Sequence, residues 1–218
     1  MNSKVKTSAT LAHNQRTEQK KASQARLSDY LSLAKPEITF LVTISALGGF
    51  LLGAESAINL LELCALLTGV ALSSSGGAAL NLYVEREHDA RMKRTSNRPL
   101  PAGRISPAVA LTAGLTCAFS GLALLLFYTN TITCLLAGTT IFLYVFLYTP
   151  LKRHTKYNTW VGTIPGALPA LGGWTAATGA FGTGGWILFG ILLIWQLPHF
   201  FALAWMYRKD YERADFRM

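Results

Sequence analysis

Charged side chains are scarce in this sequence of 218 residues. Aspartate, glutamate, lysine and arginine together make up 14% of it, against roughly 25% in a typical soluble domain. Hydrophobic residues account for 51%, and the mean hydropathy is +0.32. This composition excludes an ordinary soluble globular domain.

Cysteine is also rare, with only three residues in the chain. Cys64, Cys117 and Cys134 lie in apolar stretches, and their spacing matches neither a metal site nor a disulfide framework. We therefore expect them to act as small buried hydrophobic side chains.

Lysine and arginine are absent from three long stretches: 36–85, 105–151 and 157–207. Each stretch is about twice the roughly 20 residues that a helix needs to cross a bilayer. Each therefore predicts a pair of transmembrane helices. The expected fold is an all-α polytopic membrane protein with six spans, near 38–56, 60–84, 107–128, 131–149, 158–178 and 185–207.

The basic residues all lie on one side of this predicted zigzag. The 20 lysines and arginines fall within residues 4–35, 86–104, 152–156 and 208–217. By the positive-inside rule, both termini are predicted to be cytoplasmic. The net charge of +9 then reflects membrane orientation and gives no reason to expect a nucleic-acid partner.

The N-terminal region is polar and has no apolar segment of the kind that a secretory signal needs. We interpret residues 1–30 as a disordered basic cytoplasmic tail and residues 31–218 as the membrane domain. Glu18 and Asp29, with few arginines nearby, argue against a mitochondrial transit peptide. A bacterial inner membrane is therefore expected, in preference to that of a mitochondrion.

The second predicted span ends in acidic side chains. If its helix continues, Asn81, Glu85, His88 and Asp89 share one arc of its surface. Glu85 and Asp89 are then like charges one turn apart, which something positive should offset. The alternatives are nearby arginines with water, or a divalent cation such as Mg²⁺, which prefers oxygen ligands and shares them with phosphates.

The loop that follows is strongly basic. Cations beside a carboxylate-bound metal suit a diphosphate, because they neutralise charge as it leaves. Contact with anionic lipid would also explain the cations, but not the carboxylates. The residues concerned are Arg91, Lys93, Arg94, Arg98 and Arg104.

At these residues the sequence resembles a known family. Asn81-x-x-x-Glu85-x-x-x-Asp89, followed by the segment 93–103, is similar to the first signature of the UbiA-type intramembrane prenyltransferases. The Lys152-Arg153-x-Thr155 segment is similar to another of their cytoplasmic loops. Residues 158–174 and 195–204 resemble the branch that prenylates protoheme IX. The resemblance covers residues 33–218.

This resemblance implies an enzyme that transfers the farnesyl group of farnesyl diphosphate to a vinyl carbon of heme b, with Mg²⁺ as cofactor. The product, heme O, would be used by terminal oxidases. A downstream heme A synthase is then an expected partner. The family fold is a nine-helix bundle that is open to the cytoplasmic side. This chain resembles its first two-thirds, with about three further spans missing after Met218, so we expect an incomplete cavity and a risk of inactivity.

The resemblance also assigns roles to residues. It implies Asn81, Glu85, Asp89 and Asp210 as catalytic residues, with the last three as metal ligands. It implies substrate contacts for Arg94, Arg98, Lys152, Arg153 and His199. Two departures stand out: Glu85 lies where the family more often has aspartate, and Ala214 interrupts the second acidic motif.

Two other functions remain open from the sequence. The first is a prenyltransferase for an aromatic quinone precursor, against which Leu82 and the Pro198-His199-Phe200 segment argue. The second is a heme-binding or transport protein without catalysis. For a transporter, charges or broken helices would be expected at mid-membrane, whereas the carboxylates here cluster at one membrane face.

Overall fold

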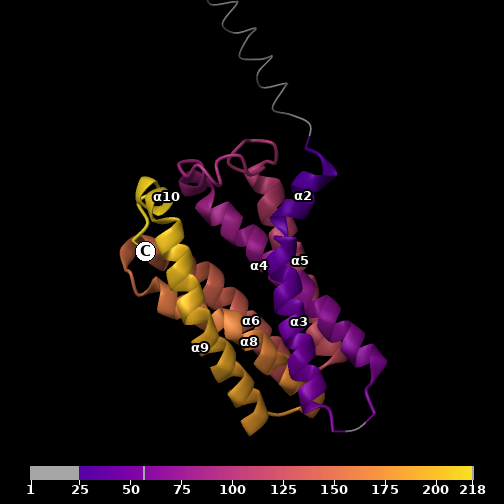
Figure 1. Ribbon diagram of the computed structural model, residues 1–218. Coiled ribbons are helices and arrows are strands. Elements are labelled where there is room, and N and C mark those ends of the chain that lie inside the picture. The colour runs from indigo at the N-terminus through magenta and orange to yellow at the C-terminus, as the bar shows by residue number, and fades with distance from the viewer. Residues whose placement is uncertain (1–24, 56, 218) are drawn as a thin grey trace, which may run out of the picture.

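The computed structural model describes residues 25–55 and 57–217, and these residues form helices without any strand (Figure 1). Most of the predicted basic tail lies outside the described residues. In chain order the elements are α2 (Leu27–Leu33), α3 (Pro36–Gly53), α4 (Leu60–Asp89), α5 (Pro107–Tyr128), α6 (Thr131–Phe142), the π-helix η1 (Leu143–Tyr148), α7 (Thr149–His154), α8 (Asn158–Thr178), α9 (Thr183–Met206) and α10 (Arg208–Arg213).

Each predicted span coincides with a helical segment. Five segments in the described part are long and apolar enough to cross a membrane: Pro36–Gly53, Leu60–Asp89, Pro107–Tyr128, Thr131–His154 and Thr183–Met206. The sixth, α8, has 21 residues, most of them buried. Because α8 faces other helices more than lipid, small and hydroxyl side chains replace large apolar ones. The protein is an all-helical integral membrane protein.

Small residues allow the helices to pack closely. α3 lies along α8, and α4 lies along α5. A Cβ atom added at Gly49 would overlap the carbonyl oxygen of Ala170, and one added at Gly173 would overlap that of Ala46. The backbones of α3 and α8 therefore touch at these glycines, as is usual where membrane helices associate through small residues.

Local sequence signals set several helix ends. α4 starts after Asn59, whose side chain accepts hydrogen bonds from two backbone N–H groups of the first turn. α5 starts after Ser106 in the same way, with Pro107 at its first position. α6 starts after Asn130, which caps Thr133 N–H.

The connections divide between two ends of the bundle. The segment between α4 and α5, α10 and the described end of the chain lie at one end, and residues 57–59 and 179–182 lie at the other (Figure 1). The basic connections are thus gathered at one end, as the charge pattern predicts.

Two predicted boundaries are wrong. α4 continues to Asp89, five residues beyond the predicted end at 84. The fourth span continues to His154 as η1 and α7, although 149 was the predicted end. Pro150 has no N–H and its ring crowds the preceding turn, and the backbone there widens into a π-helix before α7 resumes.

The predicted tail is also too long at its C-terminal side. Residues 27–30 belong to α2. Asp29 is buried, accepts a hydrogen bond from the backbone N–H of Arg26 and pairs with Arg104 at 3.0 Å. The backbone hydrogen bond and the arginine lower the pKa of Asp29. These contacts hold α2 against the connection that follows α4.

Candidate active site

The last two turns of α4 carry the acidic motif. Because α4 remains helical to Asp89, Asn81, Glu85 and Asp89 share one face at intervals of four residues. All three side chains face into the protein, with residue exposures of 0%, 4% and 1%. Buried carboxylates need partners, and cations from two other segments, Arg98 and Lys152, supply them.

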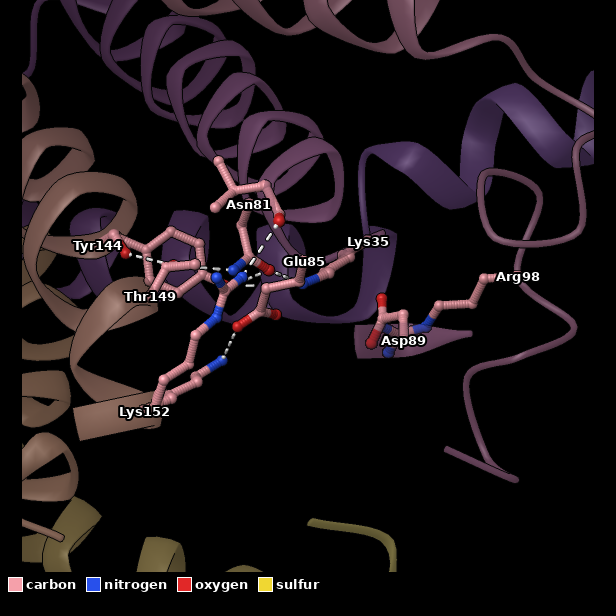
Figure 2. A network of polar contacts seen from close by, with 10 residues as sticks. Lys35, Asn81, Glu85, Asp89, Arg98, Tyr144, Thr149 and Lys152 are labelled. Atoms are coloured by element: carbon pink, nitrogen blue, oxygen red, sulfur yellow. Dashed lines mark hydrogen bonds and ion pairs between the residues drawn. The ribbon is translucent and has the colours of Figure 1, made fainter. Parts of the chain in front are cut away.

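Asn81 lies at the centre of a hydrogen-bond network (Figure 2). Its side-chain oxygen accepts from Lys35 Nζ at 2.7 Å and from the Tyr144 hydroxyl at 3.2 Å. Its side-chain nitrogen donates to Thr149 Oγ1 at 2.9 Å. Each polar atom of the amide is therefore engaged, which fixes its orientation toward the candidate site.

The two carboxylates pair with different cations. Lys152 Nζ donates to Glu85 Oε1 at 2.8 Å, and the side chains are only 13% and 6% exposed. Arg98 Nη1 donates to Asp89 Oδ2 at 2.9 Å. Figure 2 shows these as two separate pairs on successive turns of α4. The site thus contains buried carboxylates, each paired with a cation. A bound anion could accept hydrogen bonds from the same cations.

Lys35 is a site residue that the sequence analysis missed. It precedes Pro36 and adopts the left-handed conformation, with φ at 45°. Burial lowers the pKa of Lys35 to about 7, although the nearby Glu85 carboxylate favours the charged form. The one available signal was its position as the last cation before a long stretch without lysine or arginine.

The π-helix η1 brings two tyrosines to the site. Tyr144 and Tyr148 stack with ring centroids 5.8 Å apart. The Lys152 ammonium lies 4.5 Å from the Tyr148 ring, a cation–π contact that adds to its pairing with Glu85. π-helical turns are frequent at functional sites, but no sequence pattern predicts one here.

Four of the residues that the sequence predicts for the site lie outside this group: Arg94, Arg153, His199 and Asp210. Arg94 packs its guanidinium on the Tyr207 ring at 4.8 Å, and its backbone N–H donates to Asp210 at 3.3 Å. Arg153 donates to the carbonyl of Val84. His199 is exposed on α9, stacked on Trp195.

The donor set fits a magnesium–diphosphate complex only in part. Among the described residues, no three histidine, cysteine or acidic side chains form a metal site by themselves. Mg²⁺ takes one or two carboxylates and completes its shell with water and phosphate oxygens. Glu85 and Asp89, with Asn81, suit that use. Asp210 pairs instead with Arg213 at 2.9 Å, so its metal role stays a prediction.

Sequence comparisons identify relatives over nearly the whole membrane domain. The UbiA prenyltransferase family matches residues 42–218. A protoheme IX farnesyltransferase from Salinibacter ruber is 55% identical over 88% of this chain and 68% of its own length. The mitochondrial protoheme IX farnesyltransferase of Homo sapiens is 44% identical over 85% of this chain and 42% of its own length.

Solved structures show the same fold at low sequence identity. A digeranylgeranylglyceryl phosphate synthase structure superposes with a TM-score of 0.74 at 19% identity, covering 88% of this chain and 67% of its own. A UbiA homolog from Archaeoglobus fulgidus, bound to GPP and Mg²⁺, gives 0.66 at 19% identity, covering 85% and 67%. The superpositions show the shared fold, and the sequence matches establish that the chain belongs to the UbiA prenyltransferase family.

Proposed function

We propose that this protein transfers the farnesyl group of farnesyl diphosphate to a vinyl carbon of protoheme IX, giving heme O and diphosphate. The observation that carries the proposal is the 55% identity to a protoheme IX farnesyltransferase over 88% of the chain. The buried group at the end of α4 supplies suitable chemistry, because its cations and carboxylates surround a polar site at one end of an apolar bundle.

In the proposed reaction the chain's residues hold the diphosphate and stabilise its departure. The Lys35, Arg98 and Lys152 side chains already donate to oxygens at 2.7–2.9 Å, and diphosphate oxygens can accept the same donors. Preorganised donors stabilise charge that develops on a leaving group. Mg²⁺, when bound through Glu85 and Asp89, supplies further positive charge to that leaving group.

The second requirement is protection of the allylic cation that remains when diphosphate departs. Water would quench this cation before the vinyl carbon could attack it. The apolar, closely packed helices that lead away from the polar end exclude water, which suits the farnesyl chain as well as the reaction.

The proposal includes a place for the protein in the cell. We place it in a bacterial inner membrane, with the polar end and both termini on the cytoplasmic side. The product, heme O, would then be available to a heme A synthase in the same membrane.

The direct test is an incubation of membranes containing the protein with protoheme IX, farnesyl diphosphate and Mg²⁺, followed by mass analysis of the heme. We expect a farnesylated heme from wild type and from Arg208→Gln, whose side chain lies at the same end outside the site. We expect about 10²–10³-fold less from Asp89→Asn, through lost charge stabilisation. Farnesylation of an added aromatic acid in place of heme would favour the quinone-type function. Heme that binds without modification would favour transport.

A further inference from the structure

A polar cavity lies beside the candidate active site. It has a volume of about 470 Å³ and is lined by His88, Arg153, Asp215, Phe216 and Arg217. These residues come from the end of α4, from α7 and from the segment after α10. The site described above uses none of their side chains.

Two buried polar atoms of this lining have no partner. Within residues 25–55 and 57–217, neither Arg153 Nε nor His88 Nδ1 forms a hydrogen bond. The only hydrogen bond from the Arg153 guanidinium there is from Nη2 to the carbonyl of Val84, at 3.4 Å. A buried donor without a partner is costly, so the lining is suited to a ligand that accepts hydrogen bonds.

The charge of the cavity favours an anion. Arg153 and Arg217 contribute two guanidinium groups to its lining. The one carboxylate, that of Asp215, already pairs with Arg91 at 2.9 Å. The two cations of the lining are therefore not neutralised by its own acidic residue.

Phe216 joins this cavity to the candidate active site. Its ring stacks on the His88 imidazole, with centroids 5.4 Å apart and an angle of 13° between the planes. The Lys152 ammonium, which pairs with Glu85, lies 6.0 Å from the same ring.

Backbone contacts hold this segment in place. The N–H of Arg217 donates to the Lys152 carbonyl at 2.7 Å, and the Arg217 carbonyl accepts from the Asn158 side-chain amide at 2.9 Å.

We propose that this cavity binds a carboxylate of the prenyl acceptor, with Arg153 and Arg217 as the main contacts. The inference rests on the proposed function, since protoheme IX carries two propionate groups. A guanidinium group matches a carboxylate with paired donors, and the His88 imidazole can add one N–H. The diphosphate would engage Lys35, Arg98 and Lys152, so each anionic part of the two substrates has its own cations.

The test compares two forms of the acceptor in detergent micelles without farnesyl diphosphate. Binding of protoheme IX and of its dimethyl ester is measured by heme absorbance for wild type, Arg153→Gln, Arg217→Gln and the control Arg208→Gln. We expect wild type and the control to bind the diacid about tenfold more tightly than the diester. We expect both cavity variants to lose most of this preference while their affinity for farnesyl diphosphate is unchanged.

The outcomes separate this inference from the proposed function. Equal binding of diacid and diester by wild type would overturn it, as would a preference that persists in both cavity variants. A loss of farnesyl diphosphate binding in Arg153→Gln would assign that arginine to the diphosphate instead. Because Arg217 is exposed, its variant decides the question if Arg153→Gln does not fold. Failure of the proposed function would appear separately, as an absence of farnesylated heme.

Discussion

Replacement of Lys152 by methionine should destabilise the protein strongly, because it strands a buried carboxylate. Lys152 Nζ lies 2.8 Å from Glu85 Oε1, and the Glu85 side chain is only 6% exposed. Removal of one partner from a buried ion pair typically costs about 3–5 kcal/mol. Lys35 lies close enough to offset part of the loss, since its charge also interacts with Glu85. We therefore expect a loss of about 3 kcal/mol.

The double variant Glu85→Gln with Lys152→Met separates the cost of a stranded charge from the value of the pair. Replacement of both members of a buried pair is often neutral or stabilising. We expect the double variant to recover most of the stability that the single variant loses. It should remain inactive in prenyl transfer, because it lacks both the cation and the carboxylate of the site.

The measurement is reversible unfolding in mixed detergent micelles, followed by circular dichroism, with prenyl transfer assayed on the same preparations. Lys209→Met provides a matched control, since Lys209 is exposed on α10. The reasoning would be refuted if Lys152→Met were as stable as wild type, or if the double variant were no more stable than Lys152→Met.

Three further predictions follow from the site, the packing and the topology. Asp89→Asn should reduce prenyl transfer about 10²–10³-fold at limiting Mg²⁺, through lost charge stabilisation; wild-type turnover would exclude its proposed role. Gly49→Ala should lower the free energy of unfolding by about 3 kcal/mol through overpacking, whereas Gly48→Ala, which meets nothing within 4 Å, should not; equal stabilities would refute the close contact. Reporter fusions should place Lys156 on the cytoplasmic side and Asn130 on the opposite side; a cytoplasmic signal at Asn130 would contradict the orientation.

The helices were predictable because their determinants are local. Stretches without cations mark the spans, and caps such as Asn59 and Ser106 mark where helices begin. Three of the four residues of the predicted arc, Asn81, Glu85 and Asp89, line the site together because helical periodicity depends on spacing alone, whereas the fourth, His88, stacks on Phe216. The π-helix was not predictable, since Pro150 can be accommodated in several ways and neighbouring helices select one.

The cations of the site depend on contacts across the chain. Lys35 reaches Asn81 over 46 residues, and Lys152 reaches Glu85 over 67 residues. The resemblance to the family assigned Lys152 to substrate binding, and the structure adds the carboxylate that holds it. Lys35 lies in none of the motifs that carry the resemblance to the family, and its left-handed backbone has no signature in a single sequence.

Similar residues in one motif have different surroundings, which limits any assignment by spacing. Arg94 and Arg98 are four residues apart in the same basic segment, yet Arg98 pairs with buried Asp89 whereas Arg94 stacks on Tyr207. Lys152 and Arg153 are adjacent, yet the lysine pairs with Glu85 and the arginine lines the neighbouring cavity. Arg94 and Arg98 lie in a loop, which does not repeat with a fixed period, and Lys152 and Arg153 are neighbours on helix α7 and point in different directions. The basic segments therefore contain cations with distinct partners, and variants at adjacent positions should affect different substrates.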